Sequence, residues 1–203
     1  MPTPDLPHSP AADRNKETIL AQLRSTLGPQ GTALEIAAGT GQHAVWFAAG
    51  LPGWTWQPTD ADPGMLPAIA QRIAQAGLAN VLPPRHLDVM APRWPAFPGR
   101  FDAVFCANML HIAPWQACLA LMAGAANHLQ PGGMLVTYGP YFERGVAPAP
   151  SNVAFDASLR ARDPSWGIRE LEQVVAAAGS AGLVFAHRHA MPANNLLLVF
   201  TAS

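Results

Sequence analysis

The chain has 203 residues and a formal net charge of −1; 50% of its residues are hydrophobic and 12% are charged. This composition is typical of one globular domain with a sizeable core, and it excludes an intrinsically disordered chain. The near-neutral charge provides no basic stripe for a phosphate backbone, so we expect no nucleic acid as a main partner.

The N-terminal segment indicates where the domain begins. Residues 1–12 contain four prolines and little hydrophobic order, which predicts a flexible arm over 1–12 and a single domain over 13–203. The N-terminus does not have the basic start and following apolar run that a secretory signal shows. No apolar stretch reaches the length of a membrane span. Two cysteines are too few for a disulfide framework. We therefore expect a cytoplasmic protein without membrane association. The sequence does not indicate which oligomeric state the protein has.

Strands and helices alternate along the chain after a first helix at about 13–27, which Gly28-Pro29 ends. A second helix is expected at 42–49, and a third begins after an N-cap at Asp62, with Pro63 in its first turn. Two more helices are expected from about Ile112 to Leu129 and from about Ile168 to Val175. Strands are expected at 32–37, 54–59, 81–87, 101–106, 134–138, 183–187 and 196–201. No helix fits between the last two strands, which must then pair antiparallel. The fold class expected is α/β: a Rossmann-like sandwich with a seven-stranded, mostly parallel sheet and a C-terminal antiparallel hairpin.

Residues 141–166 interrupt this alternation, because the segment is too long for an ordinary connection in a compact domain. A short helix at about 155–162 fits inside it. The segment is interpreted as a lid, a substrate loop or a surface excursion.

A glycine turn ends the first strand and opens directly into a helix, in Leu34-Glu35-Ile36-Ala37-Ala38-Gly39-Thr40-Gly41-Gln42-His43. Without a Cβ, the two glycines let a ligand approach the backbone, and the helix start offers amide donors to an anion. The alternative is a tight turn that binds nothing. Two acids favour a ligand: Asp60 ends the next strand, where it can accept hydrogen bonds from ribose hydroxyls, and Asp88 follows the third strand.

These motifs resemble those of the class I S-adenosylmethionine-dependent methyltransferases. The resemblance rests on five segments in the same order: residues 34–41, 59–62, 86–88, 101–108 and 129–133. It implies that fold, S-adenosylmethionine as cofactor, and a cofactor site made of Glu35, Gly39, Thr40, Gly41, His43, Asp60, Asp88 and Asn108.

A narrower resemblance is carried by Arg14-Asn15-Lys16, Gly39-Thr40-Gly41-Gln42-His43, Ser151-Asn152-Val153-Ala154-Phe155-Asp156 and Met191-Pro192-Ala193-Asn194-Asn195. These segments are similar to the methyltransferase-like protein 26 family, which has bacterial members. That resemblance implies a fold and a cofactor but no acceptor.

Three side chains are candidates for a general base. His111 follows the fourth strand at the rim where such sheets hold ligands, and its imidazole titrates near neutrality. Tyr141 and Asp156 are the other two candidates. The alternative for His111 is a helix-start residue bonded to backbone, and for Tyr141 a buried hydroxyl.

The candidate substrate-binding residues are polar or aromatic, and three of them lie in the long connection: Arg14, Asn152, Arg160 and Trp166. The alternative is that their polar groups face water. No metal site is expected, because His187 and His189 share a strand face without a third ligand.

The function predicted is methyl transfer from S-adenosylmethionine to an unidentified small-molecule acceptor. Two alternatives stay open. A nicotinamide-dependent oxidoreductase also uses a Gly-x-Gly turn and a distant acid. A protein could also bind S-adenosylmethionine without catalysis.

Overall fold

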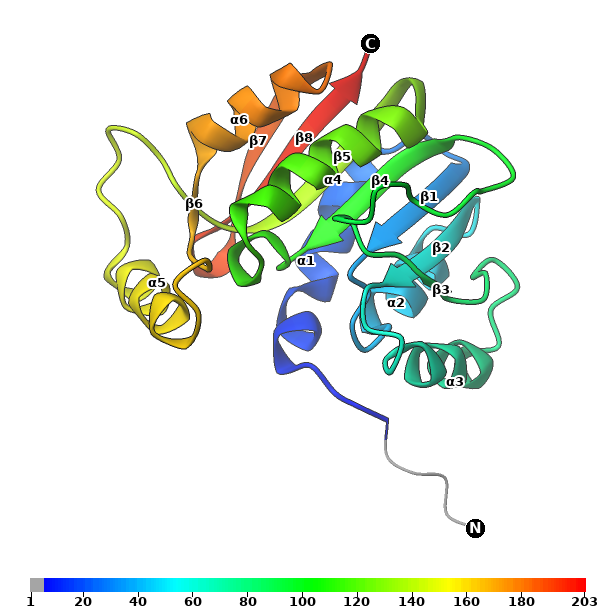
Figure 1. The fold of residues 1–203 in the computed structure, drawn as a ribbon. Coiled ribbons are helices and arrows are strands. Elements are labelled where there is room, and N and C mark those ends of the chain that lie inside the picture. Colours follow the sequence, from blue (N-terminus) through cyan, green and yellow to red (C-terminus); the bar gives the residue numbers. More distant parts are fainter. Residues whose placement is uncertain (1–5) are drawn as a thin grey trace. The chain divides into compact units, whose positions relative to one another are not determined.

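The computed structural model describes residues 6–203, which form two compact units, one ending at Asp88 and one beginning at Val89 (Figure 1). The first unit contains α1 (Pro10–Thr26), β1 (Gly31–Ile36), α2 (Gln42–Gly50), β2 (Trp54–Asp60), α3 (Leu66–Ala76) and β3 (Arg85–His86). The second contains β4 (Phe101–Ala107), the 3₁₀ turn η1 (Leu110–Ile112), α4 (Trp115–His128), β5 (Leu129–Phe142), α5 (Pro150–Arg162), β6 (Arg169–Glu170), α6 (Leu171–Ser180), β7 (Leu183–Met191), η2 (Pro192–Asn194) and β8 (Asn195–Ala202).

The first unit is built on three parallel strands in the order β3-β2-β1. The last four residues of β1 are buried, as a strand covered on both faces requires. The helix α2 contacts α1, α3 and β2. Because parallel strands end at one edge, the turn after β1 and the last residue of β2, Asp60, lie at the same edge.

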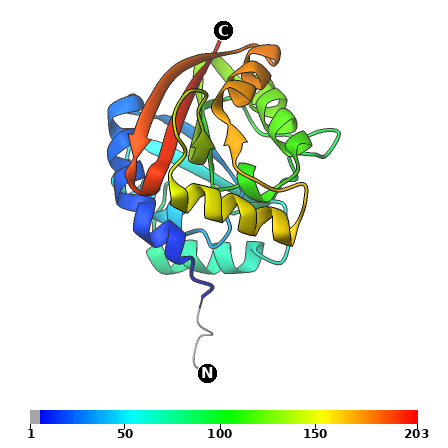
Figure 2. The same cartoon turned by 90° about the vertical axis from the view of Figure 1, so that its left-hand side faces the viewer.

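In the second unit β4 pairs parallel with β5, and β8 pairs antiparallel with both β5 and β7. The predicted C-terminal hairpin is therefore confirmed. The helices α4 and α6 contact each other and lie side by side in Figure 1. Figure 2 shows α5 with its first turn beside the connection between β7 and β8, where Asn152 bonds Asn194.

Several boundaries differ from those expected because proline acts by position. The helix α1 begins at Pro10, where a missing N–H costs nothing, and Ser9 accepts from the Ala12 N–H at 3.3 Å. The predicted arm over 1–12 thus ends earlier, and its residues 1–5 lie outside the described residues. The expected cap at Asp62 is wrong: Asp62 accepts from the Gly64 N–H at 2.8 Å in a turn, and α3 starts at Leu66.

Other differences concern strands and the long connection. Pro83 and Pro84 reduce the expected third strand to the two residues of β3. The strand β5 is longer than expected and begins before Pro131, with a register shift opposite residues 101–103. Ile112 lies outside α4, in the 3₁₀ turn. The helix α5 is longer than expected, and β6 is an eighth, unpredicted strand that pairs with the end of β5.

Candidate functional site

The turn after β1 has three residues in the left-handed region: Ala37 at φ 55°, Gly39 at 56° and Gly41 at 73°. The two glycines have different structural roles. A Cβ on Gly41 would lie 3.1 Å from Cγ2 of Ile69, so Gly41 lets α3 approach the turn. A Cβ on Gly39 would have no described heavy atom within 4 Å, so open space lies over that residue. Gly39 is therefore where a ligand can reach the backbone.

Asp60 joins the end of β2 to this turn. Its side chain is buried, Oδ2 accepts from the Gly39 N–H at 2.7 Å, and Oδ1 accepts from the Asp62 N–H at 2.9 Å. Each carboxylate oxygen can accept a further hydrogen bond. The half-buried Asp88 follows Leu87, whose N–H donates to the Asp60 carbonyl at 2.9 Å. The two predicted ligand-binding acids thus follow neighbouring strands at one edge.

Glu35 lies inside β1 with only 1% of its surface exposed. Its Oε2 accepts from Nε1 of Trp56 at 2.6 Å. Burial raises the pKa of the Glu35 carboxyl to about 8, since it outweighs the Trp56 hydrogen bond and Asp60 adds a second negative charge nearby. Glu35 is therefore mostly neutral near pH 7, and in this structure it joins β1 to β2.

The helix α1 and its N-cap residue, Ser9, hold the glycine turn through side-chain contacts. His43 is buried, its Nε2 lies 2.7 Å from Oδ1 of Asn15, and its ring stacks on Phe47. Burial lowers the pKa of His43 to about 4. Oε1 of Gln42 accepts from the Ser9 N–H at 2.6 Å. Asn15 and His43 belong to two segments of the narrower resemblance, which was the available signal for this contact.

Of two basic residues in the first unit, Arg72 contacts this turn and Arg14 is exposed. Arg72 donates from Nε to the Thr40 carbonyl at 2.7 Å and from Nη2 to the Pro7 carbonyl at 2.6 Å, and so connects the turn to the N-terminal segment. Arg14, a predicted substrate-binding residue, is exposed on α1. The structure therefore brings Arg72, which was not predicted, to the turn.

In the second unit, Asn108 and His111 lie beside the backbone of β5. Asn108 has φ 59°, and its N–H donates to the Tyr138 carbonyl at 2.8 Å. A Cβ on Gly139 would lie 3.5 Å from Nδ1 of His111 and 3.9 Å from Oδ1 of Asn108. Both side chains would thus be in ordinary van der Waals contact with a Cβ there, so both lie next to the strand at this residue. The structure therefore places these two predicted site residues together.

His111 is buried in the η1 turn with its ring edge-on to Phe155 of α5 at 5.4 Å between centroids. Its ring nitrogens make no hydrogen bond to any residue of the described range. Burial, with smaller contributions from the cations Arg169 and Arg162, lowers the pKa of His111 to about 4. The imidazole is therefore neutral near pH 7 and can accept a hydrogen bond.

Arg169 of β6 holds the turn that carries His111, a contact that no sequence motif predicted. Its guanidinium donates to the carbonyls of Leu110 at 2.9 Å, of Ser165 at 3.1 Å, and of Ala113. One charge-assisted donor thus joins the η1 turn to the segment that precedes β6. Arg169 is therefore a positioning residue for the η1 turn.

The other two candidate bases are engaged within the protein. Tyr141 is buried, and its hydroxyl donates to Oγ1 of Thr137 at 2.8 Å. Burial raises the pKa of Tyr141 well above its ordinary value. Asp156 accepts from the Ile168 N–H at 2.7 Å and from Nε of Arg160 at 2.8 Å. Their positions favour structural roles, and their catalytic roles stay predictions.

The predicted substrate-binding residues of the long connection lie at opposite ends of α5. Asn152 is buried in the first turn and donates from Nδ2 to the Asn194 carbonyl at 3.0 Å. Arg160 pairs with Asp156 near the other end, eight residues or about 12 Å along the helix. Trp166 follows α5 and stacks under Arg162, with 5.3 Å between Cζ and the ring centroid. Asn152 is therefore remote from Arg160 along the helix.

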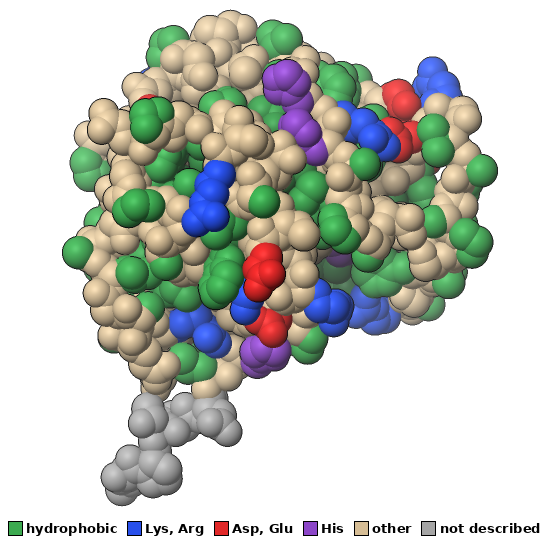
Figure 3. All heavy atoms as spheres, turned by 180° about the vertical axis from the view of Figure 1, so that it is seen from behind, with side chains coloured by type: hydrophobic (Ala, Val, Ile, Leu, Met, Phe, Trp, Pro, Cys, Tyr) green, Lys and Arg blue, Asp and Glu red, His purple; other side chains and the backbone are tan. Residues whose placement is uncertain are grey.

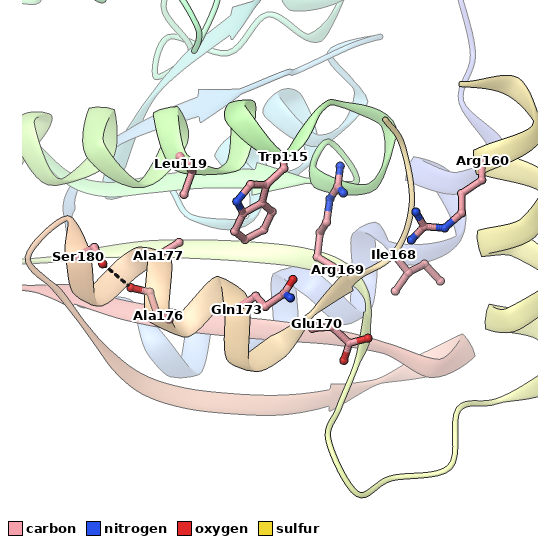
Figure 4. A pocket seen from close by; sticks show the side chains of 10 residues that line it. All are labelled: Trp115, Leu119, Arg160, Ile168, Arg169, Glu170, Gln173, Ala176, Ala177 and Ser180. Atoms are coloured by element: carbon pink, nitrogen blue, oxygen red, sulfur yellow. Dashed lines mark hydrogen bonds between the residues drawn. The ribbon is translucent and has the colours of Figure 1, made fainter. Parts of the chain in front are cut away.

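A groove of about 750 Å³ lies between α4 and α6 in the second unit (Figure 4). Arg169 points from β6 toward the turn before α4, where its guanidinium bonds carbonyls, and the Ser180 hydroxyl donates to the Ala176 carbonyl at 3.0 Å. Trp115 and Leu119 supply apolar surface. Three of the polar residues that line the groove, Arg160, Arg169 and Ser180, bond other groups of the protein, and we do not assign the chemistry to it.

Within residues 6–203 no helix has the length and apolar character needed to cross a membrane. No group of three or more His, Cys, Asp or Glu side chains there could hold a metal ion. The rings of His187 and His189 lie 5.8 Å apart without a third ligand in the described range.

Residues 6–202 match the model of a family described as "Protein of unknown function (DUF938)". The resemblance to the methyltransferase-like protein 26 family is not tested by this match and stays a prediction.

Solved structures identify the fold. The chain is similar to the S-adenosylmethionine-dependent methyltransferase SibL in its apo form, with TM-score 0.79, 22% identity, and 95% of this chain and 55% of that chain covered. An O-methyltransferase family 2 protein of Planctomyces limnophilus in complex with apigenin matches with TM-score 0.75, 17% identity, and coverage of 93% and 62%. Human N-acetylserotonin methyltransferase in complex with SAM matches with TM-score 0.79, 14% identity, and coverage of 95% and 53%.

These matches confirm the predicted fold class, an α/β Rossmann-like methyltransferase fold with mostly parallel strands and a C-terminal antiparallel hairpin. At these identities the likeness concerns the fold alone. The chain spans less than two thirds of the length of each of these three proteins.

Proposed function

The chain belongs to the DUF938 family, and we propose that it is an S-adenosylmethionine-dependent methyltransferase with a small-molecule acceptor. The observation that carries this proposal is the turn after β1. Gly39 has open space over its backbone, and the Asp60 carboxylate that holds its N–H ends the neighbouring strand. In folds of this kind, ligands bind beyond the carboxyl ends of parallel strands.

The residues of the first unit fit an adenosine-bearing cofactor. Asp60 is the ribose acceptor in this proposal, because its oxygens retain lone pairs beyond the two amides they bind. Asp88 accepts from the adenine amino group, and the backbone of residues 39–41 contacts the amino-acid part. Glu35 and His43 support the turn from behind, since the first bonds Trp56 and the second bonds Asn15.

When bound, S-adenosylmethionine supplies a methyl group on a cationic sulfur; transfer to an acceptor lone pair breaks the carbon–sulfur bond, leaves its electrons on sulfur, and releases any acceptor proton to a base or water. His111 is the side chain proposed to meet the acceptor. With a pKa of about 4 it is a weak base near pH 7, so we assign it hydrogen-bond acceptance that orients an acceptor hydroxyl. Asn108, beside it, is the second polar contact.

The comparisons support this choice over the alternatives. The matched proteins bear methyltransferase names, one holds SAM and one holds apigenin. No residue described here favours nicotinamide over S-adenosylmethionine. On the face shown in Figure 3, Lys and Arg side chains form several separate groups, some next to acidic side chains. This arrangement supports a small-molecule acceptor rather than a nucleic acid.

Isothermal titration with S-adenosylhomocysteine and with NAD tests the proposal. We expect the wild-type chain to bind S-adenosylhomocysteine, and Asp60→Asn to weaken it at least about tenfold, because one ribose acceptor becomes an amide donor. Asp62→Asn is the matched control, since Asp62 is exposed and bonds a turn amide. Binding of NAD without S-adenosylhomocysteine would overturn the proposal. Binding without turnover over a broad acceptor panel would leave a cofactor-binding protein.

A further inference from the structure

A second cavity of the second unit, of about 290 Å³, lies beside the first turn of α5. Three segments line it: the end of β5 with the loop that follows, the start of α5, and the connection from β7 to β8. Two of these segments, 151–156 and 191–195, carry the narrower resemblance. The cavity is close to the lower end of the range of small-molecule pockets, roughly 300–1,000 Å³.

The amide side chains in this cavity are oriented by their own protein contacts. Nδ2 of Asn152 faces the Asn194 carbonyl at 3.0 Å, which fixes the amide, because an oxygen in that place would face another oxygen. Nδ2 of Asn195 donates in the same way to the Pro192 carbonyl at 3.0 Å. In both residues Oδ1 makes no hydrogen bond within the described range.

Asn152 is the stronger of the two observations. The residue is more than nine-tenths buried. Every fully buried side-chain nitrogen or oxygen atom among the described residues has a hydrogen-bond partner, whereas Oδ1 of Asn152 has none. Its Oδ1 is therefore not sealed within the protein, and the residue lines the cavity. A ligand there must supply a hydrogen-bond donor, since an amide oxygen only accepts.

The charges in the cavity cancel. Nε and Nη2 of Arg188 donate to the two carboxylate oxygens of Glu143 at 2.8 and 2.7 Å. This side-by-side geometry is the strong form of the ion pair. An anionic ligand would compete with Glu143, and a cationic ligand with Arg188. The remaining lining includes Val146, Pro148 and Met191, which suit an apolar ring or chain.

The backbone at the cavity is also held in an uncommon conformation. Ala193 and Asn194 are consecutive non-glycine residues with φ 56°. Such a conformation persists only where surrounding contacts fix it. Asn152 and Ser151 supply those contacts, through the Asn194 carbonyl at 3.0 Å and the Asn194 side chain at 3.3 Å.

We infer that this cavity binds the part of the methyl acceptor that lies away from the reacting group at His111, and that this part is uncharged, largely apolar and carries a hydroxyl group that donates to Oδ1 of Asn152. That the ligand is the methyl acceptor rests on the proposed function. The binding site itself stands on the cavity, the fixed amide and the neutralised ion pair.

The test is an NMR titration of the ¹⁵N-labelled chain with three probes of one size and different charge: benzyl alcohol, benzoate and benzylammonium. We expect saturable shifts of cavity residues with benzyl alcohol and weaker binding of the other two. Val146→Trp should fill the cavity mouth and abolish those shifts, whereas Val184→Trp should not. Val146 and Val184 are both 57% exposed, so the second variant controls for a surface tryptophan.

Two further variants address the chemistry. Asn152→Ala should weaken benzyl alcohol at least about fivefold, the loss of one hydrogen bond, while Asn127→Ala on the exposed face of α4 should not. Glu143→Gln should free Arg188 and raise the affinity for benzoate. Benzoate binding best to the wild type, no binding by benzyl alcohol, or equal binding to Val146→Trp would each overturn the inference. S-adenosylhomocysteine is titrated separately, so its failure to bind would overturn the proposed function alone.

Discussion

Replacing Glu35 by Gln should change how the stability of the protein depends on pH. The carboxyl is 1% exposed, and its pKa is raised from 4.5 to about 8 by burial. Between these two values the folded state therefore holds a proton that the unfolded state has released. By linkage, stability falls as pH rises through this window, by up to about 1.4 kcal/mol per pH unit.

Two histidines act in the opposite sense at lower pH. The pKa values of His43 and His111 are lowered from 6.5 to about 4, so the unfolded state binds more protons and stability rises with pH over that range. Their contribution ends near pH 6.5, above which only Glu35 of these three groups titrates up to pH 8. The three groups together predict maximal stability near pH 6.5 and a loss of about 2 kcal/mol from there to pH 8.

Urea unfolding at pH 6.5 and pH 8, followed by circular dichroism, measures this difference. Gln keeps an acceptor for Nε1 of Trp56 and cannot ionise, so Glu35→Gln should lose most of the fall. Glu17→Gln is the matched control, because Glu17 is exposed on α1 and should keep the wild-type profile. A wild-type stability that is flat from pH 6.5 to 8, or an equal fall in Glu35→Gln, would refute the reasoning.

Three more substitutions test how the two units hold their sites. Asn15→Ala removes the 2.7 Å hydrogen-bond contact with the buried His43 ring, so thermal unfolding should show a loss of about 1 kcal/mol; an unchanged melting temperature would contradict the contact. Ala37→Gly should raise the free energy of unfolding by about 1 kcal/mol in urea titrations, because φ 55° strains a Cβ; destabilisation would show that the residue is not left-handed. Arg169→Met should raise the pKa of His111 in an NMR titration while leaving it below 6.5, since burial is the larger cause; a fall in that pKa would be inconsistent with the placement.

The sequence predicted those parts of the fold that local signals determine. The buried apolar strand that ends at Ile36, the glycines that follow it, and the apolar run at Phe101–Cys106 each specify an element without reference to the rest of the chain. The closing hairpin followed from the absence of a helix between two strands. The structural effect of proline was predicted less well. Pro150 begins α5 whereas Pro83 shortens β3, and which effect applies depends on where the helix or strand lies.

The sequence could not predict which polar groups become partners across long separations. The residue types needed for a site were visible, but Glu35 finds Trp56 twenty-one residues away and Arg169 finds Leu110 fifty-nine residues away. Tyr141 was a candidate base because of its residue type and its place after the fifth strand, and the fold buries its hydroxyl against Thr137. Burial and pairing are properties of the packed chain, and they decide whether an ionisable group is available for chemistry.

The segments of the narrower resemblance have related structural roles within their own units. Asn15 bonds His43 behind the glycine turn, and Asn152 bonds the carbonyl of Asn194 at the β7–β8 connection. Each contact uses a buried amide to hold a neighbouring segment, and losing such a hydrogen bond costs about 1 kcal/mol. Such residues constrain the shape of a turn more strongly than they specify a ligand.

It follows that acceptor specificity in this chain should depend on residues that these contacts leave free to vary. Around the cavity beside α5, these are the Glu143–Arg188 pair and the apolar Val146, which line the space without holding the turn. Exchanging the charge of that pair can alter which acceptors are bound while the Asn152–Asn194 contact keeps the cavity formed. Proteins with the same amide contacts but different charges at these two positions should therefore share a cofactor and differ in acceptor.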